Sequence, residues 1–213
     1  MLALGAAGVL WGGRAQDALT RWLHPDLAAL LPSGGRFRIY TVVGHLPRRD
    51  PSEYRLRIGG MVDRPLDLGF ADLTAMAPTR LVKDFQCVTG WRVPKVPWAG
   101  VRLADLLDAA GVQAGATALT FRSFDGVYTE SLTLDQARRD DVIVAYEMEG
   151  KPISAAHGGP VRLYVAPMYG YKSIKWLDAV EAVDPEQPGY WERRGYDTHA
   201  WVGRSNGRQD DPT

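Results

Sequence analysis

Apolar and polar residues alternate near the start of the main part of the chain. Tyr54, Leu56 and Ile58 are apolar, whereas Arg55 and Arg57 between them are charged. This period of two is typical of a strand that buries one of its faces. Other apolar runs, bounded by turn-forming residues, predict further strands in the same way. They cover residues 37–43, 80–86, 142–146, 161–165 and 177–183, and residues 117–124 and 127–132 form a predicted hairpin through Asp125-Gly126.

Three short segments carry the spacing and the end signals of helices. Residues 70–76 end before a proline, and a leucine-rich segment that begins at Leu103 ends at Gly111. Residues 134–139 form the third predicted helix. Residues 89–100 are rich in turn-forming and aromatic residues and predict a long loop. Because strands outnumber helices and the connections are long, the predicted fold class is α+β (mixed α/β).

Composition divides the chain into three parts. Residues 1–35 are an apolar and amphipathic segment that ends in a linker, and residues 36–184 hold the predicted strands and helices. Residues 185–213 are a polar tail, and we expect its last part, residues 203–213, to be loosely held. The apolar run at the N-terminus is shorter than the roughly 20 residues of a membrane span. It suits the middle of a signal peptide, although no basic residues precede it, and it equally suits a short buried helix.

Charge is balanced over the whole chain but not along it. The 213 residues include 25 basic and 25 acidic side chains, which argues against nucleic-acid binding through overall positive charge. Hydrophobic residues make up 46% of the sequence, so a folded core is expected. Residues 80–102 and 151–176 are both basic, and residues 125–149 between them are acidic. If the two basic stretches meet in the fold, they form a site that attracts anions.

Cys87 is the single cysteine of the chain and lies at the end of a predicted strand. It forms no internal disulfide, and a cysteine in this position is often a small buried hydrophobic residue. Arg80, Lys83 and Arg92 are close to it in sequence, and positive charge favours the thiolate form that binds metals or attacks electrophiles. The four histidines lack metal-ligand spacing, so a cage of protein ligands is not expected. A cofactor that brings most of its own ligands needs only one thiolate.

A second segment, residues 157–176, combines glycines with basic side chains. Gly158-Gly159 lets the backbone approach a ligand, Arg162 offers a bidentate fork, and residues 169–175 add backbone donors and two ammonium groups. This set suits a phosphate. The same residues also fit a plain turn followed by solvated lysines. The sequence contains neither a P-loop nor a G-x-G-x-x-G motif, which excludes the usual nucleotide-binding loops.

Taken together, these segments resemble the sulfite oxidase-like family of molybdopterin-binding oxidoreductases. The resemblance covers residues 36–184 and implies a sulfite oxidase-type fold of mixed sheets with molybdenum and molybdopterin as cofactors. Cys87 is implied as the catalytic residue and metal ligand. The segments that carry the resemblance are 85–92 (Phe-Gln-Cys-Val-Thr-Gly-Trp-Arg), 96–100, 157–162 (His-Gly-Gly-Pro-Val-Arg), 172–176 (Lys-Ser-Ile-Lys-Trp) and, more weakly, 40–47. The implied cofactor-binding residues are Tyr40, His45, Thr89, Arg92, His157, Arg162, Lys172, Ser173, Ile174 and Lys175.

One departure from the family pattern bears on the activity. Sulfite oxidases have a sulfite-binding arginine and an asparagine where this chain has Val43 and Gly44, so sulfite oxidation is not expected. The chain is more similar to the short bacterial one-domain members, which are related to the catalytic subunit of the periplasmic methionine-sulfoxide reductase. This similarity implies two-electron oxygen-atom transfer on a small-molecule or protein-bound S-oxide or N-oxide.

The resemblance also implies where the protein works and with what partner. It implies export to the periplasm or to the extracytoplasmic face of a membrane. Because the chain has no C-x-x-C-H haem motif, electrons are expected to pass to or from an external carrier, and in this family the carrier is often a membrane haem b subunit. No nucleic-acid partner is expected.

Two other functions fit the residues without the resemblance. One is a hydrolase or transferase with Cys87 as nucleophile and a histidine as base, although no local protease signature accompanies the cysteine. The other is a cofactor-free module of the same fold that uses its basic loops to bind an anion or an acidic partner. Metal content and the absorption spectrum distinguish both from a molybdenum enzyme.

Overall fold

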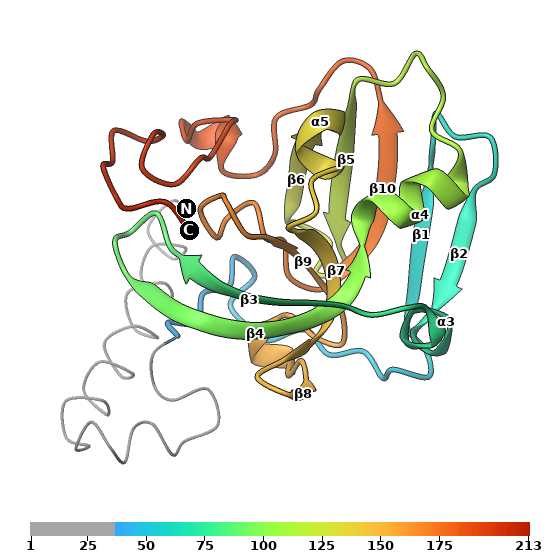
Figure 1. The fold of residues 1–213 in the computed structure, drawn as a ribbon, viewed down its shortest axis with the longest axis horizontal. Helices are drawn as coiled ribbons and strands as arrows, with labels where there is room; N and C mark the ends of the chain where they lie inside the picture. Colours follow the sequence, from blue (N-terminus) through green and yellow to red (C-terminus); the bar gives the residue numbers. More distant parts are fainter. Residues whose placement is uncertain (1–36) are drawn as a thin grey trace. The chain divides into compact units, whose positions relative to one another are not determined.

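The computed structural model describes residues 37–213, and these fall into two units that meet at Leu46 and Pro47. Every helix and strand of the described residues belongs to the second unit (Figure 1). Within the described residues, no helix has both the length and the apolar character needed to cross a membrane. The strands are β1 (Arg55–Gly60), β2 (Leu66–Gly69), β3 (Thr79–Gln86), β4 (Arg92–Arg102), β5 (Ala118–Ser123), β6 (Thr129–Thr133), β7 (Val142–Met148), β8 (Lys151–Pro152), β9 (Arg162–Val165) and β10 (Leu177–Val183). The helices are α3 (Phe70–Ala75), α4 (Leu103–Ala110), α5 (Leu134–Ala137) and the short 3₁₀ turns η1 (Ala155–His157) and η2 (Glu192–Arg194).

The first sheet has the strand order β2-β1-β10-β5-β6. Strands β1 and β10 are parallel, and the other neighbours are antiparallel. The predicted alternation in β1 is confirmed, since Leu56 and Ile58 are buried and the arginines between them are exposed. Helix α4 covers the core with Leu103, Leu106 and Leu107, and it ends at a left-handed Gly111 as its sequence predicts.

The second sheet is built around a long, curved hairpin of β3 and β4 (Figure 1). Its order is β3-β4-β7-β8, and β9 also pairs with β7. Apolar residues from both sheets, such as Phe121, Val144, Leu163 and Val180, form one hydrophobic core. Strand β3 ends one residue before Cys87, so the hairpin carries the cysteine away from the centre of this core.

Two sequence-based expectations about local structure are wrong. Residues 37–43 form no strand, and much of the predicted loop 89–100 is strand β4. Strand β4 pairs with β7 only from Trp98 onward, so its two prolines, Pro94 and Pro97, lie where β3 is its only partner. A missing N–H is tolerated on a strand that is paired on one side. Turn-forming residues therefore do not exclude a strand at this position.

The polar segment after residue 185 is held to the rest of the second unit, and its last residues, 203–213, are held more firmly than expected, since Arg92 donates to Asp211 O (2.8 Å) and to Pro212 O (3.0 Å). The amide of Tyr169 donates to Ala200 O (2.8 Å), and the amide of Val202 donates to Pro167 O (3.1 Å). Ala200 and Val202 are buried. A short apolar run within the polar sequence thus anchors this segment to the loop that follows β9.

Candidate active site

Cys87 lies in the tight turn that joins β3 to β4. The amide of Gly90 donates to Cys87 O (3.0 Å), and the amide of Cys87 donates to Trp91 O (2.9 Å). The thiol group is half-buried, and its Sγ lies 3.2 Å from the hydroxyl Oγ1 of Thr89. The turn therefore presents a partly accessible thiol, and this placement differs from that of a cysteine enclosed by aliphatic side chains.

The loop after β9 packs directly against the strand that carries Cys87. The amide of Gly170 donates to Gln86 O (2.8 Å). A Cβ atom on residue 170 would lie 2.4 Å from the ring of Phe85, so only glycine permits this close approach. The two basic stretches of the sequence are thereby brought together, which is the condition under which they would form a site that attracts anions.

Aromatic rings separate Arg162 from the Cys87 turn. The Arg162 guanidinium carbon lies 5.4 Å from the ring centre of Phe85 and 5.6 Å from that of Trp98. Phe85 stacks on Trp91 at 5.7 Å, and Trp98 stacks on Tyr164 at 4.3 Å. The buried guanidinium therefore rests on two aromatic faces, a favourable arrangement for a cation. The role of Phe85 as the contact between both segments was not apparent from the sequence.

The Arg162 guanidinium also joins two backbone segments. Its Nη1 donates to His157 O at 2.7 Å, its Nη2 to Ser173 O at 2.6 Å, and its Nε to Leu163 O at 3.3 Å. These three bonds fix the guanidinium in one orientation. They also hold the turn at His157 and the segment at Ser173 at a fixed separation.

Gly158 brings the same two segments into direct contact. Its φ is +96°, and a Cβ atom on it would lie 2.5 Å from Cβ of Lys175. The amide of Trp176 donates to Gly158 O (2.9 Å). A side chain at position 158 would push Lys175 away, so the glycine decides where this lysine lies.

His157, Arg162 and Lys175 form a cluster of buried basic groups, in which positive neighbours destabilise the charged forms of His157 and Lys175. Burial, with the charges of Arg162 and Lys175, lowers the pKa of His157 to about 4. Burial and the charge of Arg162 lower the pKa of Lys175 to about 7, although Asp125 partly opposes this. Burial lowers the pKa of Arg162 to about 10. A bound anion would reverse these shifts, because it stabilises the charged forms.

Ser173 and Ile174 lie in the same segment, and both are buried. The Ser173 hydroxyl accepts from the Val165 amide (2.9 Å), and Ile174 O accepts from the Leu163 amide (2.9 Å). Both residues thus align the segment with β9.

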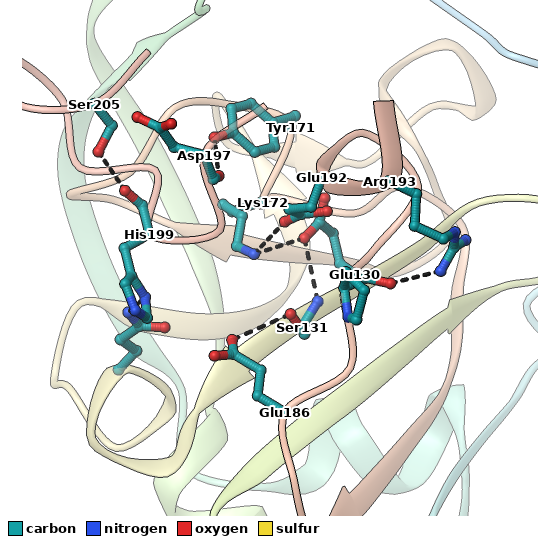
Figure 2. Close-up of polar contacts among 12 residues, drawn as sticks. Glu130, Ser131, Tyr171, Lys172, Glu186, Glu192, Arg193, Asp197, His199 and Ser205 are labelled. Carbon is teal, nitrogen blue, oxygen red and sulfur yellow. Dashed lines mark hydrogen bonds and ion pairs between the residues drawn. The ribbon is translucent and has the colours of Figure 1, made fainter. Parts of the chain in front are cut away.

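Lys172 lies in the core instead of facing the basic cluster. Its Nζ is 2.8 Å from Glu130 Oε2 and 2.6 Å from Glu192 Oε1, and all three side chains are at most 1% exposed (Figure 2). The sequence predicted an ammonium group directed at a phosphate. The structure instead gives this group two carboxylate partners.

Arg92 and Thr89 border the Cys87 turn in different ways. Thr89 contacts the thiol through its hydroxyl. Arg92 donates to Asp84 Oδ2 (2.6 Å), to Asp211 O (2.8 Å) and to Pro212 O (3.0 Å). Arg92 therefore holds the last residues of the chain against the hairpin. This contact was not predicted, because the tail sequence carries no motif.

Tyr40 and His45 belong to the unit that ends at Leu46, so the structure does not relate them to Cys87. Tyr40 is half-buried and His45 is exposed. The Nδ1 atom of His45 lies 3.1 Å from Val43 O. The predicted apolar and amphipathic segment, residues 1–35, lies outside the described residues.

Comparison with known proteins gives a consistent assignment. The family model of the oxidoreductase molybdopterin-binding domain matches residues 43–191. The uncharacterized oxidoreductase YuiH of Bacillus subtilis (strain 168) is 35% identical over 147 residues, which are 69% of this chain and 74% of that protein. Human mitochondrial sulfite oxidase is 32% identical over 74% of this chain but only 34% of its own length. The protein-methionine-sulfoxide reductase catalytic subunit MsrP of Gluconobacter oxydans (strain 621H) is 29% identical over 76% of this chain and 57% of its own.

A solved structure shows the same fold. The sulfane dehydrogenase SoxCD from Paracoccus pantotrophus superposes with a TM-score of 0.66 at 24% identity, covering 75% of this chain and 46% of that one. The matches confirm the sulfite oxidase-type fold, the oxidoreductase class and the molybdenum–molybdopterin cofactor. They give no support to a cysteine-dependent hydrolase or a cofactor-free binding module. The chain belongs to the family of oxidoreductases that contain a molybdopterin-binding domain.

Proposed function

We propose that the protein is an oxygen-atom transferase in which Cys87 supplies the protein's thiolate ligand to molybdenum. In this proposal His157, Arg162 and Lys175 bind the phosphate of the pterin. The observation that carries it is the basic cluster: Arg162 donates to His157 O, and Gly158 brings Lys175 against the same turn. Burial lowers the pKa of all three side chains, and the neighbouring positive charges lower those of His157 and Lys175 further. Its packing against the strand that ends at Cys87 supports one site for both ends of the cofactor.

The chemistry of the donor groups fits this cofactor. A soft, half-buried thiolate suits molybdenum, and three basic side chains beside a left-handed glycine suit a phosphate. Arg162 is held by three backbone carbonyls, so it needs little reorganisation when an anion arrives. When bound, the cofactor supplies two-electron oxygen-atom transfer, and the protein supplies binding, orientation and electrostatics.

The proposed substrates are S-oxides or N-oxides, either small or protein-bound, with reduction driven by an external electron carrier. The similarity to a methionine-sulfoxide reductase subunit supports this class. Val43 and Gly44, at positions that are arginine and asparagine in sulfite oxidases, argue against sulfite. A membrane haem b subunit is the proposed carrier. The proposed location is the periplasm, which the apolar N-terminal sequence supports.

The decisive experiment compares wild type with Cys87→Ser, expressed in a host that makes the cofactor. We expect wild type to contain close to one molybdenum per chain and to show thiolate-to-metal absorption. Cys87→Ser should lose this absorption and its turnover while keeping its fold. Val82→Ser is the matched control, because Val82 is 64% exposed on the same strand. Unchanged absorption and turnover in Cys87→Ser would rule out the cysteine as the ligand.

A substrate panel tests the finer proposal. A reduced viologen dye serves as electron donor for dimethyl sulfoxide, methionine sulfoxide and trimethylamine N-oxide, and sulfite oxidation is measured with ferricyanide. We expect turnover with at least one oxide and only background rates with sulfite. Turnover with sulfite alone would contradict the proposed substrate class without affecting the cofactor assignment.

A further inference from the structure

A buried ionic triad lies at the start of the proposed phosphate-binding segment. Lys172 is completely buried, and its ammonium group contacts Glu130 of β6 and Glu192 of η2 (Figure 2). The two carboxylates come from elements that are far apart in sequence. One lysine therefore connects three parts of the second unit.

Further groups surround the triad and give Glu130 additional hydrogen bonds. The amide of Ser131 donates to Glu130 Oε2 (3.1 Å), and the Tyr128 hydroxyl donates to Tyr171 O (2.7 Å) and lies 3.3 Å from Glu130 Oε1. A Cβ atom on Gly189 would lie 2.5 Å from Glu192 Oε2. Burial raises the pKa of Glu130 well above its usual value, against the lowering effect of Lys172. The triad is thus tightly enclosed.

The backbone beside Lys172 leads directly to the basic cluster. The Lys172 amide donates to Tyr169 O (3.0 Å), and the Ile174 amide donates to Lys172 O (3.1 Å). The carbonyl of the next residue, Ser173, accepts a hydrogen bond from Arg162. Lys175 follows two residues later. A displacement of Lys172 would therefore move both the Arg162 contact and Lys175.

We propose that Lys172 is a positioning residue and not a phosphate ligand. Through Glu130 and Glu192 it fixes the segment that brings Ser173 O and Lys175 to Arg162. This inference depends on the proposed function, because it concerns which lysine meets the cofactor phosphate.

Electrostatics disfavour the opposite role. A phosphate that contacted the Lys172 ammonium would lie beside two carboxylates that are both within 2.8 Å of Nζ. These carboxylates would repel it, and the ammonium is 0% exposed. Lys175, in contrast, lies among basic groups that an anion would stabilise. The two lysines of one short motif therefore have opposite surroundings.

The test uses pyrophosphate as a probe of cofactor-free protein and thermal unfolding as the readout. The variants are Glu192→Gln, Lys172→Arg and Lys175→Met. Glu186→Gln is the matched control, since Glu186 is a half-exposed acid that contacts the neighbouring Ser131. If the triad positions the segment, Glu192→Gln lowers Tm and weakens pyrophosphate binding about tenfold, as expected for loss of a supporting contact. Glu186→Gln leaves the Tm and the pyrophosphate affinity unchanged. Lys172→Arg keeps the positive charge but still lowers both, because the enclosed site cannot hold the larger guanidinium group.

A ligand role for Lys172 predicts the reverse. Removing a carboxylate would then leave Lys172 more available, and Glu192→Gln would bind pyrophosphate as well as wild type or better. That result, or wild-type binding by Lys175→Met, overturns the proposal. If Glu192→Gln does not fold, Glu130→Gln takes its place, because it removes the other carboxylate contact of Lys172 while keeping the size of the side chain. Absence of any pyrophosphate effect on wild type would remove the anion site on which the positioning role depends.

These readouts need no molybdenum. If the proposed function is wrong, the wild-type protein will contain no molybdenum even after expression in a host that makes the cofactor. The Tm order of the triad variants and their pyrophosphate affinities would still be measured. The two failures are therefore distinguishable.

Discussion

Arg162 and Lys175 belong to one basic cluster, but they relate differently to the fold. Arg162 donates to three backbone carbonyls and rests on two aromatic rings. Lys175 makes its nearest ring contact with Trp176, 4.2 Å from Nζ to the ring centre. The charge of Lys175 is opposed by Arg162 in the absence of an anion. Arg162 is therefore part of the scaffold as well as the site, and a bound anion would favour the charged form of Lys175.

Replacing Arg162 with leucine should destabilise the protein even without cofactor. The carbonyls of His157 and Ser173 would lose a buried donor, and each such loss costs about 1–3 kcal/mol. We expect the free energy of unfolding of cofactor-free protein to fall by about 2–5 kcal/mol in denaturant titrations. The control is Arg204→Leu, an exposed arginine, which should cost less than about 0.5 kcal/mol. Equal stability of both variants would show that the three carbonyl contacts contribute little.

Strands and helices with regular apolar spacing were predictable from the sequence. Strands whose geometry comes from hydrogen bonding to neighbouring strands were not. Strand β1 and helix α4 follow from alternating residues and from a leucine pattern that glycine ends. The sequence predicts a loop at strand β4 because its prolines and glycine are typical of turns, whereas its strand geometry comes from pairing with β3 and β7. Strand β2 and the two-residue strand β8 are too short for a clear period.

The candidate site follows the same division. The sequence pointed to Cys87, Arg162 and Lys175 through residue type and local charge. It could not show that Lys172 turns toward Glu130 and Glu192, since these residues are distant in the chain. Two lysines three residues apart look alike in a sequence, and only the fold supplies carboxylates to one of them.

The last residues of the chain lie against the Cys87 turn, and loosening them should expose the thiol. Asp210 accepts from the Tyr169 hydroxyl (2.8 Å) and from Arg208 (2.6 Å), and a Cβ atom on Gly90 would lie 3.0 Å from Arg208 Nη2. In Asp210→Ala both contacts are lost. We expect iodoacetamide to alkylate Cys87 of cofactor-free Asp210→Ala several-fold faster than in wild type, as measured by mass spectrometry. The reason is that local opening of the C-terminal segment then requires less free energy.

The matched control for this prediction is Asp211→Ala. Asp211 contributes its backbone carbonyl to Arg92, and alanine keeps that carbonyl. Its alkylation rate should therefore equal that of wild type. Because Cys87 is the single cysteine, every alkylated chain reports this site. Identical rates in both variants would show that the segment does not shield the thiol.

Across the whole molecule, acidic residues from the 125–149 stretch balance the basic stretches by local pairing. Glu130 pairs with Lys172, Glu147 pairs with Arg80 at 3.2 Å, and Asp140 pairs with Arg102 at 3.0 Å. A net charge of zero for the whole chain is therefore compatible with a positively charged phosphate site. Of this acidic stretch, Asp125 is the residue whose charge acts on Lys175.

Loading with the cofactor should stabilise the whole protein most near neutral pH and less at alkaline pH. In cofactor-free protein the pKa of Lys175 is lowered from 10.5 to about 7, so between these values the unfolded chain binds more protons and stability rises with pH. A bound phosphate favours protonated Lys175, so binding takes up a proton above pH 7 and weakens as the pH rises. The gain in Tm on loading should therefore shrink between pH 7 and 9.

Differential scanning calorimetry of loaded and cofactor-free protein at pH 7, 8 and 9 measures this gain. Lys175→Met is the variant that isolates the cause, because methionine keeps much of the side chain's volume and carries no proton. Its gain should be smaller than that of wild type at pH 7 and nearly independent of pH. A wild-type gain that stays constant or grows toward pH 9 would mean that Lys175 does not meet the cofactor's negative charge. The basic cluster would then need another explanation, since the mutual repulsion of its side chains would persist in the loaded protein.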